Sequence, residues 1–105
     1  MSVSVIIPCY NRELVVAETI DCILAQTQPP SEIIAVDDGS TDGTVGVLES
    51  YGSKVRIIRQ KNQGPSAARN AGLAAATSDF VWFMDSDDLA SPNKLEVQSA
   101  ALERQ

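Results

Sequence analysis

The chain of 105 residues has the length of one domain, and its 44% hydrophobic and 21% charged residues are typical of a globular domain rather than a disordered segment. Its net charge of −6 argues against nucleic acid as the main partner, because duplex binding requires a basic surface. The apolar runs are too short for a transmembrane segment and the N-terminus lacks a secretory signal, so we expect a cytoplasmic protein with two free, reduced cysteines.

The first half of the chain predicts two strands that alternate with two helices. Residues 3–8, VSVIIP, predict a strand, and residues 13–27 predict a helix. The apolar side chains of this helix recur at helical spacing, at Leu14, Ala17, Ile20, Ile23 and Leu24. Residues 32–36, EIIAV, predict the second strand, which runs into the loop DDGSTDGT, and a helix over residues 43–51 follows.

The second half repeats this alternation. Residues 54–60, KVRIIRQ, predict the third strand, and the Ala-rich residues 64–77 predict a helix with a proline in its first turn. Residues 80–84, FVWFM, predict the fourth strand. Residues 91–105 predict a last helix that begins with an N-cap serine and a proline.

This βαβαβαβα order predicts an α/β fold, with an open, parallel, Rossmann-like sheet and helices on both faces. Lys54, Arg56 and Arg59 interrupt the third strand, and charged side chains suit an edge strand. We therefore expect the strand order 3-2-1-4. Ligands of such sheets bind beyond the carboxyl ends of the strands, where residues 10–11, 37–38, 61–62 and 85–88 supply polar or charged side chains.

Asp85, Asp87 and Asp88 crowd three carboxylates together, with no Lys or Arg between Arg69 and Lys94. Crowded carboxylates raise one another's pKa unless a positive charge lies among them. Mg²⁺ or Mn²⁺, bound by one or two carboxylates and by substrate phosphates, supplies such a charge. A helix cap at Asp88 explains only one of the acids, so we expect a metal site.

Other polar residues at the strand ends suit an organic ligand. We expect one of Asp37 and Asp38 to accept hydrogen bonds from a base or ribose, and the other to form a turn. Arg69 suits a diphosphate or a carboxylate, with a surface arginine as the alternative, and Tyr10 suits either a base or the plain rim of a site. The chain lacks the G-x-G-x-x-G and GxxxxGK[ST] motifs, which excludes the Rossmann and P-loop manner of holding phosphates.

Four motifs, VSVIIPCYNRE, IIAVDDGSTDGT, NQGPSAARNAGL and FVWFMDSDDLASP, together resemble the N-terminal half of glycosyltransferase family 2, nucleotide-sugar transferases of the GT-A fold. The resemblance implies a UDP- or dTDP-linked sugar donor and Mn²⁺ or Mg²⁺. It also implies transfer with inversion to a glycan or lipid-linked acceptor, in cell-surface polysaccharide or glycolipid synthesis. A full-length member is expected to lie in the cytoplasm, peripheral to the inner face of the membrane.

The candidate substrate-binding residues are Pro8, Tyr10, Asp38, Asn62, Arg69 and Asp85. The resemblance implies that Pro8 and Tyr10 border the base and that Asp38 hydrogen-bonds it. Asp85 and Asp87 match the family's D-x-D motif, which implies that Asp87 binds the metal and that Asp85 contacts the donor or the metal.

No residue matches the family's carboxylate base, so we expect no catalytic residue within this chain. Residues 1–105 are then a single donor-binding domain without the acceptor lobe, inactive alone, whose exposed apolar surface favours self-association.

Two phosphoacceptor classes also place acids after parallel strands. A receiver domain carries its acidic pair after the first strand, whereas residues 37–38 follow the second. A HAD-type phosphatase carries D-x-D-x-T, whereas Leu89 occupies the fifth position here. A non-catalytic interaction domain is the third alternative.

Overall fold

The computed structural model describes residues 2–86; residue 1 and residues 87–105 lie outside the description. The elements in chain order are β1 (Val3–Cys9), α1 (Val16–Leu24), β2 (Glu32–Asp37), α2 (Thr44–Glu49), the 3-10 helix η1 (Gly52–Lys54), β3 (Arg56–Arg59), α3 (Pro65–Ala75) and β4 (Phe80–Phe83). This is the predicted alternation as far as β4. The predicted last helix lies outside the described part of the chain.

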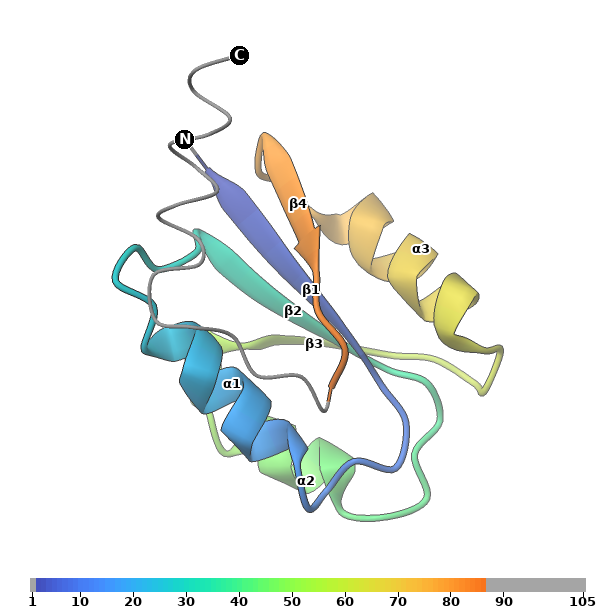
Figure 1. Ribbon diagram of the computed structural model, residues 1–105. Helices are drawn as coiled ribbons and strands as arrows, with labels where there is room; N and C mark the ends of the chain where they lie inside the picture. The colour runs from blue at the N-terminus through green and yellow to red at the C-terminus, as the bar shows by residue number, and fades with distance from the viewer. Residues whose placement is uncertain (1, 87–105) are drawn as a thin grey trace.

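All four strands form one parallel sheet in the order β3-β2-β1-β4 (Figure 1), which confirms the predicted order. β1 is central, and its Ile6 pairs with Ile34 of β2 on one side and with Phe83 of β4 on the other. β3 is an edge strand, and its Arg56 and Arg59 are exposed as expected.

Helices cover both faces of the sheet, because β1 and β2 are apolar on both sides. α1 and α2 pack on one face, in a core that includes Val5, Ile7 and Ile20. α3 packs on the other face, where Ala68 meets Ile34 and Val36 of β2 (Figure 1).

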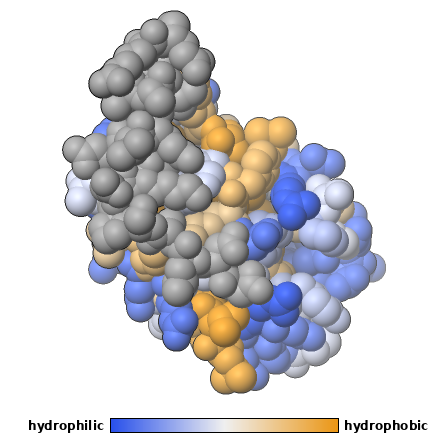
Figure 2. Space-filling model, viewed as in Figure 1, coloured by the Kyte–Doolittle hydropathy of each residue, from blue (hydrophilic) through white to orange (hydrophobic). Residues whose placement is uncertain are grey.

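α3 approaches the sheet closely because one of its residues has no side chain. A Cβ added at Gly72 would collide with the Ile6 side chain of β1. The Ala-rich helix therefore packs tightly on the sheet, and the close approach brings Arg69, one turn earlier, toward the end of the sheet. At the other edge β4 leaves Phe80 and Phe83 exposed, and apolar residues gather over this strand in Figure 2.

The first helix is shorter than predicted, and Leu14 is not part of its apolar face. Leu14 precedes α1 and is 89% exposed. The reason is that long-range hydrogen bonds hold the preceding residues in a turn: Asn11 N donates to Ser40 Oγ at 3.0 Å and Arg12 N to Thr44 Oγ1 at 2.8 Å.

The helices and the cysteines bear on two further expectations. Within residues 2–86 no helix combines the length and the apolar character that a membrane span requires. Cys9 and Cys22 do not form a disulfide bond, as predicted.

Candidate functional site

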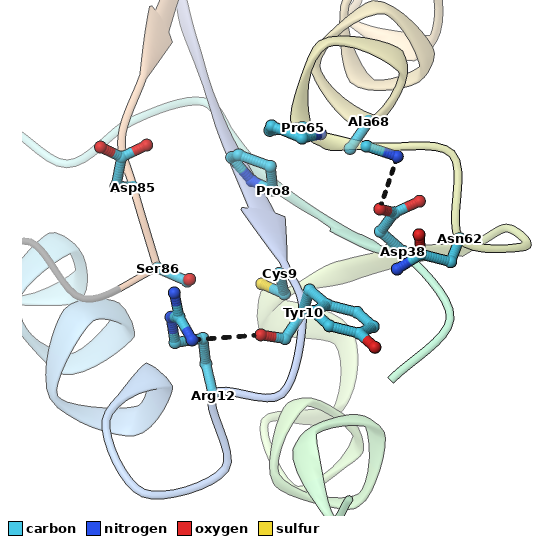
Figure 3. Close-up of a pocket in the computed structure, with 11 residues that line it drawn as sticks. Pro8, Cys9, Tyr10, Arg12, Asp38, Asn62, Pro65, Ala68, Asp85 and Ser86 are labelled. Atoms are coloured by element: carbon cyan, nitrogen blue, oxygen red, sulfur yellow. Dashed lines mark hydrogen bonds between the residues drawn. The ribbon is translucent and has the colours of Figure 1, made fainter. Parts of the chain in front are cut away.

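An open cavity of about 460 Å³ lies at the carboxyl ends of the strands, where the chain order reverses between β1 and β4 (Figure 3). Side chains from β1, from the loops after β2 and β3, from the start of α3 and from the segment after β4 line it. Five predicted substrate-binding residues are among them: Pro8, Tyr10, Asp38, Asn62 and Asp85. The topology thus brings together side chains that lie up to 77 positions apart in the sequence, as expected for a parallel sheet.

Asp38 organises the loop that forms one wall of this cavity. Its carboxylate is 4% exposed and accepts hydrogen bonds from Gln60 Nε2 at 2.9 Å, Gln63 N at 2.8 Å and Gly64 N at 3.0 Å. Burial raises the pKa of Asp38, but these three bonds outweigh it and hold the pKa below its ordinary value. Oδ2 accepts only one of the three bonds and retains capacity for a ligand N–H, so the predicted contact with a base stays a prediction.

Asp37, the other acid of the pair, forms a turn. It is 2% exposed, and its Oδ2 accepts a hydrogen bond from Ser40 N at 3.2 Å. The turn continues through Gly39, whose φ of +78° suits glycine. A Cβ at Gly39 would lie 2.8 Å from Asn62 N, so the glycine lets the loop after β2 contact the loop after β3. Of the two acids, Asp37 is therefore the one that forms the predicted turn.

Asp85 leaves the sheet at the end of β4 and has a counter-charge on α3. Arg69 Nη2 lies 3.5 Å from Asp85 Oδ1, and the two side chains are 39% and 59% exposed. A pair this exposed contributes only about 0–1 kcal/mol to stability, so a ligand or cation can displace it at little cost. Arg69 is not among the residues that line the cavity but pairs with one of them, and its predicted contact with the donor stays a prediction.

Arg12 was missed by the sequence interpretation and lines the same cavity. Its Nη1 donates to Tyr10 O and to Asn11 O, both at 3.3 Å, and the guanidinium lies on the opposite wall from Asp38 (Figure 3). Within residues 2–86 Arg12 forms no salt bridge with an acid. The salt bridge found there joins Arg69 and Asp85. The place of Arg12 in the polar turn after the first strand was the signal that could have identified it.

The other lining residues that were not predicted as site residues are Cys9, Gly64, Pro65, Ala68 and Ser86. Cys9 is 1% exposed, and burial and the nearby Asp37 raise the pKa of its thiol to about 12, against a smaller opposing effect of Arg12. A neutral thiol is a poor nucleophile and a poor metal ligand, so Cys9 serves as packing at the cavity floor.

The residues present fit a divalent cation that is held in part by the ligand itself. Mg²⁺ and Mn²⁺ take oxygen ligands, usually one or two carboxylates plus substrate phosphates. Asp85 offers an accessible carboxylate at the cavity, and no group of three or more His, Cys, Asp or Glu side chains occurs between residues 2 and 86 that could bind a cation alone. Asp87 and Asp88, the other acids of the predicted metal site, lie outside the described residues.

Comparisons with known proteins agree with this geometry. The family model "Glycosyl transferase family 2" matches residues 4–105. A glycosyltransferase of Rickettsia felis is 44% identical over 104 residues, which are 96% of this chain and 17% of that protein. A glycosyltransferase of Nostoc sp. is 45% identical over 100 residues, which are 91% of this chain and 31% of that protein. The chain thus spans less than a third of the length of either relative.

A solved structure extends the likeness to three dimensions. The crystal structure of S. aureus TarS 1–349 in complex with UDP-GlcNAc superposes with a TM-score of 0.92 at 34% identity, over 99% of this chain and 32% of that one. The parallel sheet with helices on both faces is therefore the GT-A arrangement expected from the motifs. With its family model covering all but three residues, the chain belongs to glycosyltransferase family 2.

Proposed function

We propose that this chain is the donor-binding part of a metal-dependent, inverting glycosyltransferase that uses a UDP- or dTDP-linked sugar. The observation that carries the proposal is the cavity at the β1/β4 reversal, which joins an aromatic side chain, a guanidinium and an accessible carboxylate: Tyr10, Arg12 and Asp85. The binding of UDP-GlcNAc by TarS, whose fold matches over 99% of this chain, supports a nucleotide-sugar ligand.

The arrangement of the walls suggests how a donor lies. Tyr10 is 44% exposed at the rim beside Pro8, where its ring can stack on a base, and Asp38 Oδ2 faces the same end. Arg12 and Arg69 lie toward the Asp85 end, and a guanidinium fork suits the two phosphates. The base therefore lies by Asp38 and the diphosphate by Asp85.

Asp85, together with Asp87, is proposed to hold Mn²⁺ or Mg²⁺. A bound divalent cation neutralises the charge that builds on the leaving diphosphate, which eases cleavage of the anomeric C–O bond. Within this chain the arginines add positive charge at the same place, and Asp38 keeps the loop over residues 60–64 in position.

Transfer to an acceptor is proposed for a longer protein, since this chain spans 15% to 40% of the length of its curated relatives. We propose a glycan or lipid-linked acceptor in cell-surface polysaccharide or glycolipid synthesis, a cytoplasmic location and a base supplied by residues after 105. Self-association of the present chain stays a prediction. The phosphoacceptor alternatives lack support, because the family model and the structural match both point to glycosyltransferases.

A thermal-shift panel of UDP, dTDP, GDP and ADP, each with and without Mn²⁺, tests the proposal. We expect UDP or dTDP to stabilise the chain only when Mn²⁺ is present, by about 2.7 kcal/mol at a ligand concentration 100-fold above Kd. Asp85→Asn should reduce this stabilisation. Asp79→Asn, the same change at the amino end of β4, serves as the matched control.

Each part of the proposal has its own contrary result. Equal stabilisation with and without Mn²⁺ contradicts the metal requirement. No response to any nucleotide contradicts donor binding, and phosphorylation of an aspartate by acetyl phosphate would favour a phosphoacceptor domain instead.

A further inference from the structure

A buried hydrogen bond connects the middle of α1 to the segment that follows β4. Thr19 Oγ1 donates to Ser86 O at 2.9 Å, across 67 positions of sequence. Thr19 is fully buried and Ser86 is 5% exposed. Figure 1 shows the segment after β4 descending toward α1, so the bond forms where the chain leaves the sheet and meets the helix layer.

This bond fixes the backbone beside the acids of the candidate site. The last ladder bond of β4 is the one that Met84 N donates to Ile6 O at 3.0 Å. Beyond it, the contact found for Asp85 within residues 2–86 is an exposed ion pair between its side chain and Arg69. The next buried backbone hydrogen bond is therefore the one that the Ser86 carbonyl accepts from Thr19, one residue after Asp85.

We infer that Thr19 is a positioning residue of the donor site, which holds the Asp85–Ser86 backbone in place so that the Asp85 carboxylate meets the cation and diphosphate. The inference rests on the proposed function for the identity of the ligand. Thr19 does not line the cavity, so its effect passes through Ser86. Without the hydroxyl, the buried Ser86 carbonyl loses this partner and the segment carrying Asp85 is free to shift.

Two substitutions separate this role from simple core packing. Thr19→Val keeps the shape and removes the hydroxyl, whereas Thr19→Ser keeps the hydroxyl and removes a methyl group. Ile23→Val removes a methyl group from a fully buried position on the same helix and serves as the control for general destabilisation of α1.

The first measurement is the Kd of UDP for the full chain by calorimetry, in Mn²⁺ and in EDTA. Thr19→Val should weaken binding in Mn²⁺ by about three- to tenfold, the range expected for one net hydrogen bond, and should leave any binding in EDTA unchanged. Thr19→Ser and Ile23→Val should bind as the wild type does. Equal losses in Thr19→Val and Thr19→Ser, or no loss in Thr19→Val, would overturn the inference.

The second measurement needs no ligand. Hydrogen exchange at the amide of Met84, which donates the last ladder bond before this segment, should be faster in Thr19→Val than in wild type, and unchanged in Thr19→Ser and Ile23→Val. If the wild type binds neither UDP nor dTDP, the proposed function is wrong, and the exchange rates still decide whether Thr19 holds this segment. Identical exchange in Thr19→Val and wild type would show that it does not.

Discussion

Replacing Asp38 with asparagine tests whether its carboxylate holds the cavity wall together. The side chain is almost the same size, so packing is preserved while the charge and one acceptor are lost. Three donors converge on the carboxylate: Gln60 Nε2 and Gln63 N on Oδ1, and Gly64 N on Oδ2. An amide has one acceptor oxygen, so in the better orientation it keeps the Oδ1 bonds and turns its NH₂ toward the Gly64 N–H.

The expected cost follows from these bonds. Asp38→Asn loses one bond to a charged acceptor, worth about 1.5–3 kcal/mol, and weakens the two that remain. We therefore expect a loss of about 2–4 kcal/mol in the free energy of unfolding at pH 7. Because the folded pKa of Asp38 lies below its ordinary value of 3.8, this contribution is present above about pH 4 and is lost as the pH falls through the lowered pKa.

Urea unfolding followed by the fluorescence of Trp82, the one tryptophan of the chain, measures this loss. Glu49→Gln removes the same charge from an exposed position on α2 and should change stability by less than about 0.5 kcal/mol. The gap between wild type and Asp38→Asn should narrow below about pH 4. A cost no larger than that of Glu49→Gln, or a gap that widens in acid, would refute the reasoning.

Two further predictions concern the packing of α3 on the sheet and the reactivity of the two cysteines. Gly72→Ala should destabilise the chain by about 1–3 kcal/mol in thermal unfolding, because the new Cβ collides with the stiff Ile6 side chain and this outweighs the better helix propensity. Gly46→Ala, where a Cβ meets nothing within 4 Å, should instead stabilise it by about 0.5–1 kcal/mol, and equal effects at the two sites would contradict the packing argument. Burial raises the pKa of Cys9 to about 12, so iodoacetamide at pH 8 should modify the half-buried Cys22 first, as mass spectrometry of digests would show; faster labelling of Cys9 would be contrary to this.

The sequence alone was sufficient for the sheet. Strands buried on both faces appear as continuous apolar runs, and the arginines at 56 and 59 mark an edge, so strand identity and strand order were both predictable. Parallel topology then collects the strand ends at one edge, which is why most of the predicted substrate-binding residues line a single cavity.

Local patterns failed where distant partners compete with them. Leu14 has helical spacing with Ala17 and Ile20, yet it stays outside the helix. Asn11 donates a hydrogen bond to the loop after β2, and Arg12 donates one to the first residue of α2. Periodicity records which residues can share a face, and it does not record that a neighbouring loop offers the backbone other partners.

The tertiary structure also decided what each polar side chain contacts. Asp37 and Asp38 are adjacent and chemically identical, but only Asp38 receives the donors of the loop over residues 60–64, because Gly39 turns the chain toward Asn62. Arg69 on α3 meets Asp85 after β4, and Gly72 lets α3 lie close to the sheet.

The bond from Thr19 to Ser86 depends in the same way on how α1 packs beside β4. Residue type and spacing thus determined the family, the sheet and the edge at which the site lies. Which donor meets which acceptor there depends on how the helices pack on the two faces of the sheet. Short-range sequence patterns do not specify the distances between these donors and acceptors.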